Sequence, residues 1–110
     1  ASTGYIVLLP RTEGSFSPSH GDFGNDLKFL VNAAQSLNTI STPSALVTFN
    51  GKVSPKAAIG GHSMGGGSSF LASASNTSVT CLFNFAAATT NPSSIASASL
   101  INVPALVISG

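Results

Sequence analysis

Residues 59–67 read Ile-Gly-Gly-His-Ser-Met-Gly-Gly-Gly and contain the pattern G-x-S-x-G, with Ser63 as its serine. This spacing is typical of a nucleophile elbow, a sharp turn between a strand and a helix that lifts the serine hydroxyl above a sheet. We expect side chains at Gly61 and Gly65 to collide where the strand and the helix pass closely. The pattern thus predicts that Ser63 is a nucleophile and that the Met64 N–H faces a developing oxyanion.

The residues on either side of Ser63 fit the two elements that such a turn joins. Lys56–Gly60 is a short apolar run of the kind found in strands, and Ser68–Ala74 continues as a helix. No lysine follows the glycines as a phosphate-binding loop requires, and no window gives the dinucleotide pattern G-x-G-x-x-G. The alternative that the residues leave open is a flexible glycine–serine turn without a catalytic role.

The composition favours a buried α/β core and excludes some partners. Hydrophobic residues make up 43% of the 110 residues, charged residues make up 6%, and the net charge is +1, so we expect no nucleic-acid partner. No apolar run approaches the roughly 18 residues of a membrane span. Cys81 is the single cysteine and is expected to be a buried thiol. Few charges with many Ser, Thr and Asn are typical of exported proteins but do not fix the compartment.

The remaining apolar runs predict strands that alternate with helices. Phe23–Leu37 has apolar residues at helical spacing, with Asn25 or Asp26 able to cap its first turn. Asn38–Pro55 is expected to be a crossover loop with little regular structure. Such alternation implies βαβ units and a parallel sheet. We expect strands at 5–9, 56–60, 79–86 and 103–108, helices at 23–37 and 68–74, and a short helix at 95–100.

Together these features resemble the middle of an α/β-hydrolase of the dienelactone hydrolase, cutinase and polyester hydrolase type. Gly4–Pro10 resembles the fourth strand of that fold, the elbow follows its fifth, and Val103–Gly110 resembles its seventh. The resemblance implies a mostly parallel, doubly wound sheet, of which this chain would supply about strands 4 to 7. It also implies a serine esterase that cleaves carboxylic esters through an acyl-enzyme on Ser63, with no cofactor and no metal.

The resemblance also implies where the rest of the catalytic machinery lies. In such hydrolases the serine comes first, then the Asp or Glu, then the His, so the acid and the base would follow residue 110. His62 occupies an elbow position that lines the site without acting as the base, and nothing in the sequence brings His20 to the serine. The acidic residues all precede the serine, which is the wrong order: Glu13, Asp22 and Asp26.

Strand order gives a second expectation. In this family the third strand lies between the fourth and the fifth, so Tyr5–Leu9 and Ala57–Gly60 should not pair with each other. The third strand also precedes the loop that supplies a second oxyanion donor. We therefore expect residues 1–110 to be the central part of one α/β-hydrolase domain, inactive alone, whose sheet is completed by the remaining segments of that domain.

The sequence leaves the substrate open. The connection Ala87–Asn102 between two predicted strands is too short to form a lid domain, which favours small-molecule or extended esters as substrates. Polyester hydrolases of this type usually carry a Trp just after the sixth strand, whereas residues 86–90 read Ala-Ala-Ala-Thr-Thr, which favours a generic esterase. The same elbow also serves acyltransferases, peptidases and phospholipid acetylhydrolases, and a hydrolase fold can survive as a non-catalytic interaction module.

Overall fold

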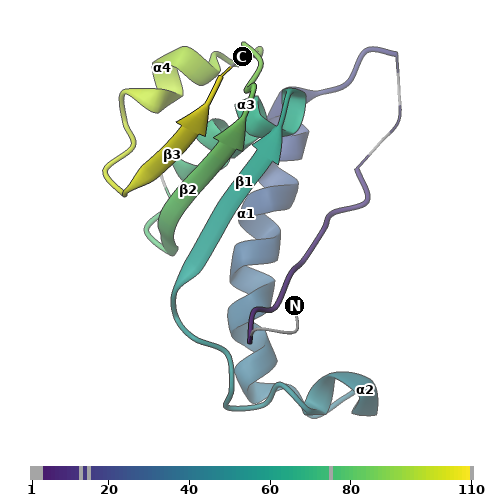
Figure 1. Ribbon diagram of the computed structural model, residues 1–110. Helices are drawn as coiled ribbons and strands as arrows, with labels where there is room; N and C mark the ends of the chain where they lie inside the picture. The colour runs from purple at the N-terminus through teal and green to yellow at the C-terminus, as the bar shows by residue number, and fades with distance from the viewer. Residues whose placement is uncertain (1–3, 13, 15, 75, 110) are drawn as a thin grey trace.

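The computed structural model describes residues 4–109 apart from residues 13, 15 and 75. The strands of this part form one parallel sheet in the order β1-β2-β3 (Figure 1). They span Ala57–His62 (β1), Val79–Phe85 (β2) and Ala105–Ile108 (β3). The expected mixed α/β class and the expected parallel sheet are thereby confirmed.

Two of the helices connect these strands, and the helices lie mainly on one side of the sheet (Figure 1). The long helix α1 precedes β1, α3 connects β1 to β2, and the short helix α4 connects β2 to β3. Within the described part of the chain, no helix is long and apolar enough to cross a membrane. The helices span His20–Ser36 (α1), Ser44–Val47 (α2), Met64–Ser73 (α3) and Ser94–Ala98 (α4), with a short 3-10 turn, η1, at Leu37–Thr39.

The first helix begins earlier than its apolar pattern predicts. The Ser19 hydroxyl accepts a hydrogen bond from the Asp22 N–H at 3.2 Å, which makes Ser19 the N-cap. The predicted caps Asn25 and Asp26 are wrong, because both lie inside the helix. A serine at the N-cap accepts a hydrogen bond from one of the free N–H groups of the first turn. The polar turn preceding the first apolar residue is therefore already helical.

The expected strand at Tyr5–Leu9 is wrong. These residues form no strand, and the Leu9 side chain is 86% exposed. A strand exists only through hydrogen bonds to a neighbouring strand, and no other described segment offers such a ladder to this one. Figure 1 shows it as a purple trace separate from the sheet. The related expectation, that residues 5–9 do not pair with β1, is confirmed.

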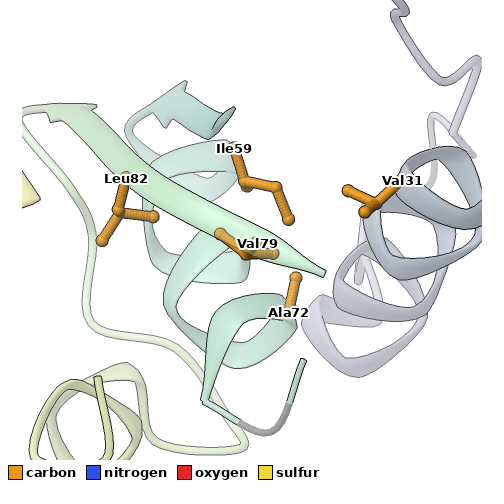
Figure 2. Close-up of a cluster of buried hydrophobic side chains, with 5 residues drawn as sticks. All are labelled: Val31, Ile59, Ala72, Val79 and Leu82. Atoms are coloured by element: carbon orange, nitrogen blue, oxygen red, sulfur yellow. The ribbon is translucent and has the colours of Figure 1, made fainter. Parts of the chain in front are cut away.

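The core lies between the sheet and the helices α1 and α3 (Figure 2). α1 packs closely on α3 because Gly24 has no side chain: a Cβ there would lie 3.1 Å from the Leu71 Cβ. The buried apolar side chains thus form one cluster that joins helices α1 and α3 to strands β1 and β2. Its members are Val31 from α1, Ile59 from β1, Ala72 from α3, and Val79 and Leu82 from β2.

The other face of the sheet is apolar and uncovered by described residues. Alternate residues of a strand point to opposite faces, and the register aligns Phe83 with Leu106 and Phe85 with Ile108 on this second face. These four side chains are 43–57% exposed. Cys81 lies on the same face and is half-buried, so the expectation of a buried thiol is wrong. The accessible surface is 7015 Å², above the about 5,600 Å² expected for a compact chain of this mass.

Truncating the core should destabilise the protein far more than the same truncation at the surface. Leu82 is 2% exposed and Leu100 is 57% exposed. We predict that Leu82→Ala lowers the free energy of unfolding by about 2–5 kcal/mol, and that Leu100→Ala changes it by about 0.5 kcal/mol or less. Urea unfolding of both variants measures the difference. Equal losses in the two variants would contradict this placement of the core.

Candidate active site

Ser63 is the single residue between the end of β1 and the start of α3. Its backbone has φ 52° and ψ −121°. A positive φ is uncommon outside glycine and costs roughly 1–3 kcal/mol, so it persists only where the surrounding structure fixes it. The chain therefore reverses from strand to helix within one residue, and the sharp turn expected at Ser63 is present.

Three backbone hydrogen bonds hold the peptide groups of Ser63. Its N–H donates to the Phe85 carbonyl at 3.1 Å, which extends the β1–β2 ladder to the turn. Its carbonyl oxygen accepts from the Gly67 N–H at 3.0 Å and from the Ala88 N–H at 2.9 Å. The bond from the Ala88 N–H fastens the loop between β2 and α4, residues 86–93, to the turn. The orientation of Ser63 is thus set by β2, by α3 and by this loop.

The glycines around Ser63 have different roles. A Cβ at Gly61 would lie 2.5 Å from the Gly65 carbonyl carbon, so the expected collision is confirmed at Gly61. At Gly65 the same expectation is wrong, because nothing lies within 4 Å of its Cβ position. That position faces open space beside the serine instead of β1. Gly67 also needs to be small, since its Cβ would collide with Ala88 and Thr90 of the β2–α4 loop.

An open depression of about 430 Å³ lies beside Ser63. The residues that line it include no Asp, Glu, Lys or Arg, and most of the side chains are apolar or small. His62 is among them, as expected for the residue that precedes the serine. The lining comprises Pro10 and Thr12 from the N-terminal segment, Phe23 and Leu27 from α1, Gly60, His62 and Ser63 from β1 and the turn, and Met64, Gly65 and Ser68 from α3.

The start of α3 makes this edge of the sheet favourable for negative charge. Met64 is the first residue of the helix, and the first N–H groups of an α-helix have no acceptor inside the helix. The positive end of the helix dipole adds to this effect. An oxyanion that forms next to Ser63 would therefore find donors and a favourable field at the Met64 end of α3.

No general base is assembled at Ser63 by the described residues. The Ser63 hydroxyl makes no hydrogen bond to any of them. His20 begins α1, its ring packs edge-on against Phe23, and it does not line the depression. Asp22 lies in the first turn of α1 and Asp26 lies further along that helix. Glu13 lies outside the described residues.

A metal site is not apparent in the described part of the chain either. No group of three His, Cys, Asp or Glu side chains there is placed to hold a metal ion.

Sequence reasoning missed Asn84. It is fully buried in β2, where its amide oxygen bonds to the Gly61 N–H of β1 and to the Ser69 hydroxyl of α3. The run from 79 to 86 predicts an apolar strand, and one amide does not disturb that pattern. The signal that could have found it is a lone Asn between two Phe residues in a strand next to the elbow.

Comparisons of the chain with protein-family models, curated proteins and solved structures gave no significant match.

The two glycines of the elbow provide a matched test of this geometry. Gly61→Ala should lower the free energy of unfolding by about 1–3 kcal/mol or more, because the strand and the helix must separate. Gly65→Ala places a methyl group in open space inside a helix and should stabilise the protein by up to about 1 kcal/mol. Thermal or urea unfolding measures both. Similar stabilities for the two variants would refute the close approach at Gly61.

Proposed function

We propose that this chain carries the nucleophile elbow of a serine hydrolase that cleaves carboxylic esters, on an α/β-hydrolase fold. The observation that carries the proposal is the backbone of Ser63, with φ 52° and ψ −121° between a parallel strand and the start of a helix. Strained backbone of this kind concentrates at functional sites. The G-x-S-x-G spacing adds a chemical reason for the strain, since it exposes a serine hydroxyl.

In the proposed mechanism the Ser63 hydroxyl attacks the ester carbonyl carbon. A general base takes the hydroxyl proton as the bond forms, and the carbonyl oxygen becomes an oxyanion that accepts a hydrogen bond from the Met64 N–H. The intermediate collapses to an acyl-enzyme and releases the alcohol, which receives the proton from the base. Water, activated by the same base, then cleaves the acyl-enzyme to the acid and regenerates Ser63. Following the chain order of the α/β-hydrolase triad, we place the base and its carboxylate partner after residue 110.

The uncovered sheet face supports a larger domain around this site. Parallel sheets are found almost only with both faces covered by helices. Here the face that bears Phe83, Phe85, Leu106 and Ile108 has no helix of the described residues on it. Further segments of the same hydrolase domain would cover this face.

The character of the depression supports a neutral substrate. Recognition of a carboxylate or phosphate usually uses Arg or Lys, and neither lines the space beside Ser63. Phe23, Leu27 and Met64 offer apolar contact to an acyl or alkyl group there. An uncharged ester therefore fits this surface better than an acidic one.

Replacement of the nucleophile should remove activity from the intact protein. Ser63→Ala should lower kcat on a short-chain nitrophenyl ester by about 10⁴–10⁶-fold, because no other group can form the acyl-enzyme. The matched control is Ser99→Ala, since Ser99 follows α4, is exposed and bonds only locally to the Ala96 carbonyl. This control should hydrolyse the ester at the wild-type rate. Full activity of the Ser63→Ala variant would rule out the proposed function.

A further inference from the structure

One polar side chain is buried beside the elbow for no evident packing reason. Asn84 is 0% exposed and stands in β2 between Phe83 and Phe85. A buried amide costs free energy unless its polar atoms are hydrogen-bonded. Its bonding partners should therefore show what this residue contributes.

The amide oxygen of Asn84 joins the two elements that flank Ser63. It accepts a hydrogen bond from the Gly61 N–H at 3.0 Å and one from the Ser69 hydroxyl at 2.8 Å. Gly61 lies on β1 just before the turn, and Ser69 lies on α3 just after it. The Ser69 hydroxyl also lies 2.7 Å from the Gly66 carbonyl oxygen, so its proton can serve either acceptor. A single oxygen atom thus ties the incoming strand to the outgoing helix.

The other end of the amide is unsatisfied. The Nδ2 atom of Asn84 is buried and has no hydrogen-bond partner among the described residues. The orientation of the amide follows from Gly61, whose N–H can only donate and therefore must face the oxygen. A buried donor without a partner is unfavourable, and an isosteric leucine would avoid it. The contribution of Asn84 is therefore its acceptor oxygen.

The two hydrogen bonds of the Asn84 oxygen hold a strained part of the backbone in place. Ser63 has a positive φ, and Gly61 lies so close to Gly65 that no Cβ fits between them. Without the Asn84 oxygen, the Gly61 N–H would lose an acceptor and the strand could move away from the helix. The turn would then be free to adopt a less strained conformation, which would also turn the Ser63 hydroxyl.

We propose that Asn84 is a positioning residue that holds Ser63 in its reactive orientation by bonding β1 to α3. This inference rests on the proposed function of Ser63 as a nucleophile. Asn84 does not line the depression beside Ser63, so it acts through the turn and not on the substrate.

The test compares two replacements of similar size in the intact protein. Asn84→Leu removes the acceptor, and Asn84→Asp keeps it while replacing the unpartnered NH₂ group. Asn84→Leu should lower the second-order rate of phosphonate labelling at Ser63 by about 10²-fold, the usual scale for a small misplacement of a reacting group. On a nitrophenyl ester, kcat should fall while KM stays within about 3-fold, because the loss concerns a transition-state interaction. Asn84→Asp should restore labelling to within about 10-fold of the wild-type rate because it keeps the acceptor.

The outcomes separate this inference from the function on which it rests. Absence of labelling at Ser63 in the wild type would overturn both. If the wild type is labelled and the Asn84→Leu variant is labelled within about 3-fold of the wild-type rate, the positioning role alone is overturned. An Asn84→Asp variant that is folded but as slow as Asn84→Leu would also overturn the positioning role. If Asn84→Leu does not fold, Ser69→Ala tests the same tie and should slow labelling about 10-fold. An unchanged rate in a folded Ser69→Ala variant would likewise overturn the inference.

Discussion

The close approach of β1 and α3 at Gly61 is the constraint on which the rest of this structure depends. A Cβ at Gly61 would lie only 2.5 Å from the Gly65 carbonyl carbon, so the strand and the helix pack without side chains between them. Ser63 must then reverse the chain within one residue, and its positive φ follows from that geometry. Bonds from β2 and from the β2–α4 loop hold the turn. This arrangement strains the backbone at Ser63, the residue whose hydroxyl the proposed chemistry uses.

The second consequence is an asymmetric sheet. On one face of the sheet, Ile59 and Leu82 are buried against Val31 of α1 and Ala72 of α3, while the opposite face leaves its aromatic and aliphatic side chains exposed. The elbow lies at the carboxyl end of β1, where ligands bind in open α/β sheets. In the proposed hydrolase domain, further segments would cover the apolar second face.

Local patterns predicted the sharp turn at Ser63 and its flanking elements. The glycine spacing around Ser63 and the apolar runs near 79–86 and 103–108 each carry their information within a few residues, and the parallel sheet follows from their alternation with helices. Ser19 was missed as a cap because the apolar stripe of α1 begins after it. Tyr5–Leu9 shows the limit of such patterns: an apolar run states a preference, but a strand also needs a partner.

The turn at the candidate nucleophile Ser63 was predictable from the sequence, and the surroundings of the turn were less so. The pattern G-x-S-x-G treats its two glycines alike, whereas the three-dimensional contacts separate Gly61, which has no space, from Gly65, which faces open space. Asn84 was missed because its hydrogen bonds, and with them its proposed role, involve two residues from other elements, Gly61 and Ser69. Such contacts join positions far apart in the chain, and a single sequence does not reveal them.

The most direct test of the central claim is to trap the covalent intermediate. The intact protein would be mixed rapidly with a nitrophenyl ester, quenched in acid within the first turnover, and digested for peptide mapping by mass spectrometry. The proposed mechanism predicts a peptide that carries the acyl group on Ser63 and a burst of nitrophenol before steady-state turnover. Turnover without a covalent adduct, or an acyl group on a different residue, would contradict it.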